Sequence, residues 1–289
     1  MSNPAAPGPL ASVRRSDPIK LAAAGLIWGA AALAQAGPSR VVSLNVCTDQ
    51  LAWLVADPGQ ILSVSPLGHD PRSAALADAL RAIPASDGSA ETVALMQPDL
   101  VVAGSYTARA TLQMLERIGI RVERFAPARS LDDARANLIR MGDLLGHADR
   151  AAALANAFDA RLAELTDAPE TRPVVAYYLP FNETASGEGL AGGILHAAGM
   201  TPISEALGLA GGDRLPLERL VLAQPDLILV GPAYDSPAQA TDLLAHPVLA
   251  ATGPLHRIAS SAAWICGTPA TLDAIAAMRD LRRDWEARQ

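Results

Sequence analysis

A fourteen-residue segment occurs twice in similar form in this chain, and this repeat restricts the fold more than any other sequence feature. The first copy reads ETVALMQPDLVVAG over 91–104, and the second reads ERLVLAQPDLILVG over 218–231, so the two align without a gap. In each copy a short amphipathic helix ends at Gln-Pro, Asp opens a turn, and an apolar run continues to Gly. A strand that is almost wholly apolar is typical of a parallel sheet covered on both faces. The repeat therefore predicts two such sheets.

A simpler explanation accounts for part of this repeat. Gln-Pro-Asp-Leu is a common way to join a helix to a strand, which explains the residues around the turn without any deeper relation. It does not explain Glu91 and Glu218, which stand seven positions before the proline in both copies.

Further apolar runs extend the strand pattern on either side of the repeat. In the first half the candidate strands are 41–44, 61–64, 100–103 and 122–125, and in the second half they are 174–179, 227–230 and a weaker 257–259. Helical patterns separate these runs. The alternation predicts an α/β protein with two three-layer lobes, mainly parallel sheets and a ligand cleft between the lobes.

A helical pattern connects the two sets of strands. Apolar residues follow helical spacing from Leu131 to Leu165, Ser130 can cap the start, and Asp132 and Asp133 lie in the first turn, where the helix dipole favours acids. We expect one long, stiff helix over 130–168, unless the chain breaks at 146–147, with an N-terminal lobe over 37–129 and a C-terminal lobe over 169–289. A stiff connector disfavours large hinge opening.

The N-terminus has the three parts of a secretory signal. Arg14, Arg15 and Lys20 precede the apolar stretch 21–33, and a small-residue site ending at Ala36 follows. The apolar stretch is short for a membrane span. We expect export to the periplasm and cleavage after Ala36, through either the general or the twin-arginine route, with a retained membrane anchor as the alternative.

Composition and motifs exclude several classes of function. The net charge of −7, without a run of Arg or Lys, argues against nucleic-acid binding. The five His residues stand at no metal-binding spacing, and the chain has neither a Gly-x-Ser-x-Gly nucleophile motif nor a phosphate-binding loop. We therefore expect no catalytic residue, no metal and no cofactor, and we expect a monomer that is not an enzyme.

The candidate binding residues follow the predicted strands, because open parallel sheets bind ligands outside the carboxyl ends of their strands. Aromatic residues make up only 4% of the chain, so their gathering after strands favours a site over mere covering of backbone. The candidates in the first lobe are Asn45, Cys47, Asp49, Leu67, Tyr106 and Arg109. Those in the second are Tyr178, Phe181, Asn182, Tyr234, Trp264 and Cys266.

The two cysteines lie at the predicted binding edges of different lobes. Cys47 and Cys266 are the only cysteines of the chain, and they stand near the start and near the end of the predicted mature protein. The sequence leaves open both a disulfide and two free thiols. A disulfide here would clamp the lobes together.

Together these features resemble the periplasmic substrate-binding proteins of ABC importers, in the class that serves vitamin B12, ferric siderophores and haem. The matching segments are 41–51, 91–102, the helix after Ser130 and 217–230. The resemblance implies two lobes joined by one long helix, a ligand in the cleft and delivery to an inner-membrane ABC permease with its ATPase. It also implies that an acid on each lobe pairs with Arg residues of the two permease subunits, and Glu91 and Glu218 match those positions. Compensation of the helix dipole explains the same acids without a partner.

The resemblance does not name the ligand. Tyr178, Phe181 and Trp264 suit stacking on a large planar ligand such as a corrin, porphyrin or catecholate. Triply anionic ferric siderophores call for several cations, and Arg109 is the clearest basic residue at the predicted cleft. We therefore expect a cobamide, with a ferric siderophore or haem as alternatives. A secreted sensor or scaffold that uses the same lobes without a transporter is a further alternative.

Overall fold

The computed structural model describes residues 37–209, 214–232, 242–258 and 260–289. The predicted export signal, with its cleavage site after Ala36, lies outside these residues, and so does Tyr234. Within the described ranges, no helix is both long and apolar enough to cross a membrane.

The first sheet has four parallel strands in the order β2-β1-β3-β4. Its strands are β1 Val41–Ser43, β2 Ile61–Ser63, β3 Leu100–Gly104 and β4 Val122–Phe125. The helices of this region are α1 Val46–Val55, the 3-10 helix η1 Pro66–His69, α2 Ala77–Leu80, α3 Ala90–Leu95 and α4 Arg109–Arg117. Both faces of the sheet are buried. Val41 and Leu100 face one apolar cluster, and their neighbours Val42 and Val101 face another.

The second sheet follows the same plan around β5. Its order is β6-β5-β8-β9, with β7 also paired to β5, and only β6 is antiparallel. Its strands are β5 Val174–Leu179, β6 Glu183–Thr184, β7 Thr201–Pro202, β8 Leu227–Val230 and β9 Leu255–Arg257. The helical segments are η2 Pro180–Asn182, α7 Leu190–Ala197, α8 Ile203–Ala206, α9 Leu217–Ala223, η3 Leu243–Ala245, α11 Pro247–Thr252, α12 Ala262–Ile265 and α13 Thr271–Glu286. The predicted two-sheet α/β architecture is confirmed, and β9 begins two residues before the predicted run.

The two copies of the repeat fold in the same way, as α3–β3 and α9–β8. After each helix the glutamine of the motif adopts a positive φ, which is 48° at Gln97 and 47° at Gln224. Each aspartate that follows the proline then binds the backbone at the start of the neighbouring strand. Asp99 Oδ2 accepts a hydrogen bond from the backbone N of Arg40 at 3.0 Å, and Asp226 Oδ2 accepts one from the backbone N of Val174 at 2.8 Å. The Gln-Pro-Asp motif thus ties each helix–strand unit to the adjacent strand.

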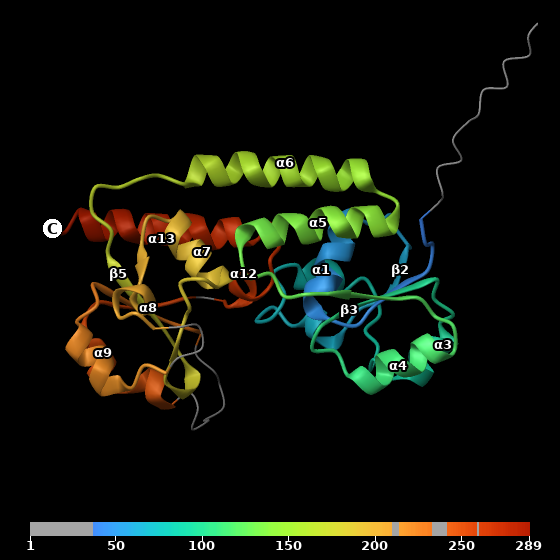
Figure 1. The fold of residues 1–289 in the computed structure, drawn as a ribbon, viewed down its shortest axis with the longest axis horizontal. Helices are drawn as coiled ribbons and strands as arrows, with labels where there is room; N and C mark the ends of the chain where they lie inside the picture. Colours follow the sequence, from blue (N-terminus) through green and yellow to red (C-terminus); the bar gives the residue numbers. More distant parts are fainter. Residues whose placement is uncertain (1–36, 210–213, 233–241, 259) are drawn as a thin grey trace, which may run out of the picture. The chain divides into compact units, whose positions relative to one another are not determined.

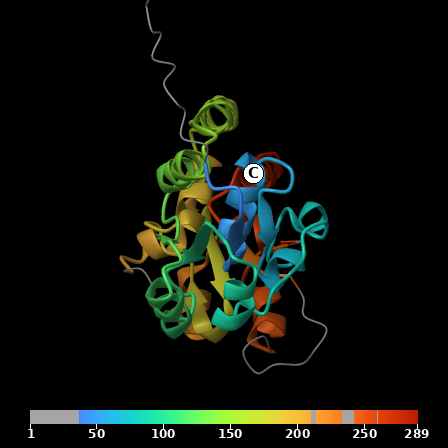
Figure 2. The same cartoon turned by 90° about the vertical axis from the view of Figure 1, so that its right-hand side faces the viewer.

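Two helices, not one continuous helix, occupy the predicted connecting segment. α5 spans Leu131–Leu145 and α6 spans Ala148–Leu165, and the two pack side by side (Figures 1 and 2). The break falls at 146–147, where Gly146 ends α5 with φ of 82°, and a Cβ there would lie 2.9 Å from the backbone of Gly37. α6 is the connecting helix, because its Ala151 belongs to the core of the first lobe and its Leu165 to the core of the second.

Candidate functional site

A pocket of about 150 Å³ lies at the carboxyl ends of β1, β3 and β4, where residues of the second lobe reach the first. The first lobe and α5 supply most of its wall, and Ile265 and Gly267 come from the second lobe. No charged residue is among the described residues that line it, which are Asn45, Cys47, Thr48, Leu51, Gly104, Ser105, Tyr106, Phe125, Ala126, Pro127, Ala128, Asn137, Ile265 and Gly267. The wall is apolar with a few neutral amides and hydroxyls, which is typical of ligand sites.

The start of α1 forms one wall of this pocket. Asn45 follows β1 in an extended conformation and caps α1, because its Oδ1 accepts a hydrogen bond from the backbone N of Cys47 at 3.0 Å. Gly104 at the end of β3 leaves room for this cap, since a Cβ there would lie 2.7 Å from Cγ of Asn45. The glycine that ends the first repeat therefore lets the Asn45 amide reach the pocket.

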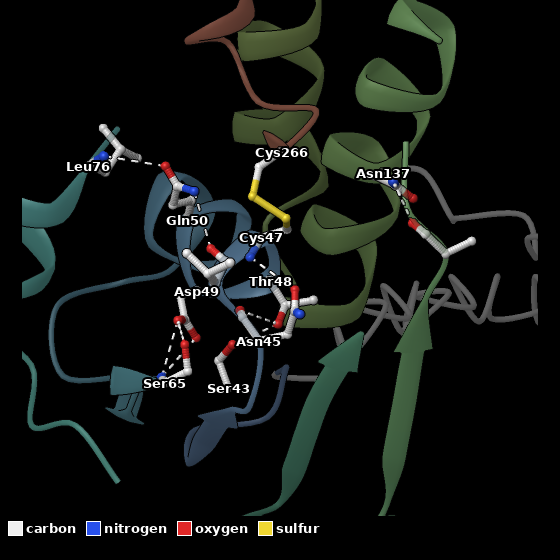
Figure 3. The surroundings of a disulfide bond; sticks show 12 residues. Ser43, Asn45, Cys47, Thr48, Asp49, Gln50, Ser65, Leu76, Asn137 and Cys266 are labelled. Atoms are coloured by element: carbon white, nitrogen blue, oxygen red, sulfur yellow. Dashed lines mark hydrogen bonds between the residues drawn. A yellow bond between two sulfur atoms is a disulfide. The ribbon is translucent and has the colours of Figure 1, made fainter. Parts of the chain in front are cut away.

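A disulfide between Cys47 and Cys266 joins the two lobes beside the pocket (Figure 3). The Cα atoms of the two residues are 5.1 Å apart, and 219 residues separate them in sequence. Cys266 directly follows α12 but packs in the core cluster of the first lobe. The bond therefore fixes the α12 end of the second lobe to the first turn of α1.

The backbone next to this disulfide approaches the first lobe closely. A Cβ at Gly267 would lie 2.3 Å from the Cβ of Ala128 and 2.9 Å from that of Ala134. Only glycine fits this approach. One edge of the pocket is thus closed by a covalent bond and a close backbone contact.

Asp49 does not reach the pocket, contrary to our expectation. Its side chain is fully buried, and its Oδ2 accepts hydrogen bonds from the backbone N and the Oγ of Ser65 at 3.1 Å and 2.5 Å (Figure 3). Burial raises the pKa of this carboxyl to about 7, although hydrogen bonds from Ser43 and Ser65 oppose the shift. Cys47 and Asp49 point to opposite sides of α1 because two helical residues differ by about 200°. Asp49 therefore holds the segment after β2.

The turn after β5 presents an aromatic side chain from a strained backbone. Phe181 and Asn182 both have φ of 63°, which is unusual for residues other than glycine, and the Phe181 side chain is 63% exposed. Two hydrogen bonds to Asn182 help to hold the turn. The Tyr178 hydroxyl donates to Oδ1 of Asn182 at 3.1 Å, and the backbone N of Leu215 donates to the Asn182 carbonyl at 2.6 Å. Such strain is typical of functional sites.

Tyr178 and Trp264 are both buried and do not present the exposed stacking surfaces that we expected. Tyr178 is fully buried in the cluster that also contains Ile203 and Leu220, because alternate residues of β5 face opposite sides of the sheet. Its neighbour Tyr177 faces the other side and packs against Trp264, with ring centroids 5.0 Å apart. Both rings of that pair are buried.

The remaining predicted residues divide by exposure. Tyr106 is 87% exposed and lines the pocket. Leu67, on η1, and Arg109, the first residue of α4, are also exposed but do not line it, and Asn182 is half-buried in the turn after β5. The structure thus brings Asn45, Cys47 and Tyr106 together at the pocket, with Cys266 bonded behind them.

Sequence reasoning missed the segment after β4. Phe125, Ala126, Pro127 and Ala128 line the pocket, and the Asn137 amide lies beside them, where its Nδ2 donates to the Ala126 carbonyl at 3.3 Å. β4 itself was predicted, so the rule that ligands bind after parallel strands could have indicated this segment. Its residues gave little chemical signal, because Phe125 is followed only by small apolar residues.

Comparison with known proteins places the chain in a family. Residues 41–254 match the model of the periplasmic binding protein family. The chain belongs to this family. The members of this family are binding proteins rather than enzymes.

Individual relatives agree with this assignment. A cobalamin-binding protein of Halobacterium salinarum is 30% identical over 203 residues, which cover 68% of this chain and 55% of that protein. The chain thus matches about half the length of its curated relative. Among solved structures, the haem-binding protein RhuT of Roseiflexus sp. RS-1 superposes with a TM-score of 0.68 at 21% identity, covering 84% of this chain and 99% of that one. The vitamin B12-binding protein BtuF of Vibrio cholerae gives 0.64 at 16% identity, covering 86% and 98%.

Proposed function

We propose that this protein captures a cobamide in the periplasm and delivers it to an inner-membrane ABC permease. The observation that carries the proposal is the neutral wall of the pocket between the lobes. A corrin ring carries many amide groups, which hydrogen-bond well to neutral amides and hydroxyls such as Asn45, Thr48 and Asn137. The 30% identity to a cobalamin-binding protein supports the same choice of ligand.

The lack of charged residues among the described residues of the pocket wall disfavours the two alternative ligands, a ferric siderophore and haem. A triply anionic ferric siderophore needs cations close to it, and the propionates of haem also favour a basic wall. Arg109 is exposed at the start of α4 but does not line the pocket. The alternative ligands therefore lack a charged partner among the described pocket residues.

The size of the pocket limits how a cobamide binds. A cavity of about 150 Å³ is well below the ~300–1,000 Å³ of typical ligand sites. A corrin would therefore place an edge in the pocket and lie across its mouth. Exposed aromatics near strand ends suit such a pose, and we assign this contact to Tyr106 of the first lobe and Phe181 of the second.

Equilibrium dialysis of the mature protein against cyanocobalamin, haemin and a ferric catecholate tests the ligand, because all three absorb visible light differently. We expect retention of cyanocobalamin. Tyr106→Ala should weaken it at least roughly fivefold, since loss of an aromatic contact removes ~1 kcal/mol or more. Trp53→Ala is the matched control, because Trp53 is an exposed aromatic outside this pocket. Retention of haemin or the catecholate alone would reject the cobamide.

In this proposal Glu91 and Glu218 bind the permease, each pairing with Arg residues of one permease subunit. Both side chains are exposed, each lies in the first turn of its repeat helix, and neither forms an ion pair with another described residue. Two equivalent acids suit a partner of two identical subunits. Reversal of both to Arg should abolish association with the permease while cyanocobalamin affinity stays unchanged. Normal docking of that variant would leave only the dipole role.

Export belongs to the same proposal. Cleavage after Ala36 would give a mature chain that begins at Gly37 and acts as a monomer in the periplasm. N-terminal sequencing of the protein from the periplasmic fraction tests this directly. An intact N-terminus on a membrane-bound form would contradict it.

A further inference from the structure

The repeat helices expose a second pair of equivalent side chains, Leu95 on α3 and Leu222 at the same position of α9. Leu95 is 86% exposed and Leu222 is 83% exposed, which places them with Tyr106 as the most exposed large apolar side chains among the described residues. Each is the fifth residue of its copy of the repeat. A single exposed leucine needs no explanation, but two at equivalent positions of a repeat do.

Folding does not require either leucine. Each repeat helix buries a different residue, which is Val93 in α3 and Leu220 in α9, and these two also occupy equivalent positions of the repeat. The exposed leucines thus add nothing to the cores and increase the apolar surface in water. A function at the surface accounts for their presence in both copies.

The leucines share a helix face with the exposed acids. Leu95 follows Glu91 at the i+4 position, and Leu222 follows Glu218 in the same way, and residues at this spacing are neighbours on a helix surface. Each lobe therefore presents one carboxylate beside one apolar side chain. In Figures 1 and 2, α3 and α9 both lie on the side of the molecule opposite α5, α6 and α13.

We propose that Leu95 and Leu222 are the apolar anchors of the permease-docking surface. The inference rests on the proposed function, and it adds the chemistry of the partner. Each of the two subunits of the partner presents an apolar hollow and, about one helical turn away from it, a cation. Charge complementarity at the glutamates and the matching exposure of both leucines favour such a two-fold partner over a second copy of this chain, whose acids would repel these acids. Buried apolar anchors hold an interface, whereas rim charges mainly steer the encounter.

Binding of the mature protein to its cognate permease–ATPase complex in lipid nanodiscs tests the inference. Leu95→Gln with Leu222→Gln should weaken binding at least about tenfold, mainly through faster dissociation. Each single variant should contribute a similar part of that loss. The effect should persist at high salt, whereas the effect of Glu91→Arg with Glu218→Arg should shrink there because salt screens exposed charges. Ile118→Gln, on an exposed apolar residue outside the repeat helices, is the control.

Two outcomes would distinguish a failure of the apolar anchors from a failure of the docking surface itself. If the leucine variants bind as tightly as wild type while the glutamate variants fail, the docking surface stands and the apolar anchors are rejected. If both sets bind normally, the docking surface itself is rejected. Cyanocobalamin affinity and melting temperature should be unchanged in the leucine variants, since both side chains lie outside the pocket and the cores.

Discussion

The first strand of each lobe leads into a turn that contributes to the proposed site, and the two turns are built differently. After β1 the chain starts a capped helix, which directs Cys47 toward the pocket and Asp49 into a buried network. After β5 it makes two left-handed residues and exposes Phe181. The two lobes thus share the plan of their sheets but differ in the turn after the first strand.

The disulfide joins the turn after β1 to the segment that follows α12 in the second lobe, and its removal should have the largest effect. Replacing Cys47 and Cys266 by Ser releases a link across 219 residues, which should lower the free energy of unfolding by about 4–5 kcal/mol. Urea unfolding followed by circular dichroism measures this. We also expect the double Ser variant to bind cyanocobalamin more weakly. Cys47 lines the pocket, and without the disulfide the two walls of the pocket lose their fixed spacing.

Thiol counting provides the control for this prediction. Unfolded wild-type protein should show no free thiol until a reductant is added, and reduced wild-type protein should unfold like the double Ser variant. Two free thiols in the untreated protein would contradict the disulfide. An unchanged urea midpoint would show that the lobes are held by their packing alone.

The sequence predicted the sheets because their inner strands β1, β3, β5 and β8 are nearly continuous apolar runs. It missed β6 and β7, which have two residues each, too few for a pattern. It also placed Tyr178 at the ligand, although strand alternation turns Tyr178 to one face and Tyr177 to the other. Which face borders a cleft depends on how the helices pack, and no local pattern records that.

The residues of the first lobe that line the pocket could be predicted in part from the sequence. Asn45 before an apolar run is a helix N-cap signal, and with that helix in place the opposite directions of Cys47 and Asp49 follow from helical geometry. We assigned both residues to the ligand because they follow a predicted strand. The contribution of 125–128 depends on the approach of Gly267 from the other lobe, which only the folded chain shows.

We expect the free energy of unfolding to depend on pH through Asp49, which lies in the helix after β1. Its pKa is about 7 in the folded protein and near 3.8 when exposed, so between these values the folded state keeps a proton that the unfolded state releases. The contribution of Asp49 to stability is therefore fully present below pH 4 and is lost as the pH rises to 7. The loss should be on the order of 2–4 kcal/mol.

Urea unfolding at several pH values tests this, with Asp49→Asn as the variant. The neutral amide cannot ionise, so the variant should lack the decline between pH 4 and 7 that wild type shows. Asp149→Asn, on an exposed carboxylate in the first turn of α6, should retain the wild-type profile. Parallel profiles for wild type and Asp49→Asn would show that the buried carboxyl does not titrate in this range.

The smallest loss of stability is expected from a change in the turn after β5, the substitution Tyr178→Phe. This variant removes the hydroxyl that donates to Asn182 and keeps the buried ring. The pKa of this hydroxyl is raised to about 12 by burial and by the charge of Glu218, so it remains a donor at neutral pH. We expect a loss of about 1 kcal/mol in unfolding free energy, the value of one hydrogen bond.

A role in positioning Phe181 predicts more than this loss of stability. Tyr178→Phe should also weaken cyanocobalamin binding by roughly twofold to fivefold, which corresponds to less than ~1 kcal/mol, because the turn that presents Phe181 loses the side-chain hydrogen bond to Asn182. Asn182→Gly removes the same hydrogen bond yet tolerates φ of 63°, so combining both changes should cost little more than either alone. Additive losses in that cycle would mean that the two residues act independently. Unchanged affinity in Tyr178→Phe, with the stability loss present, would make the hydroxyl a structural group only, and the second lobe would then hold Phe181 through the backbone bond from Leu215.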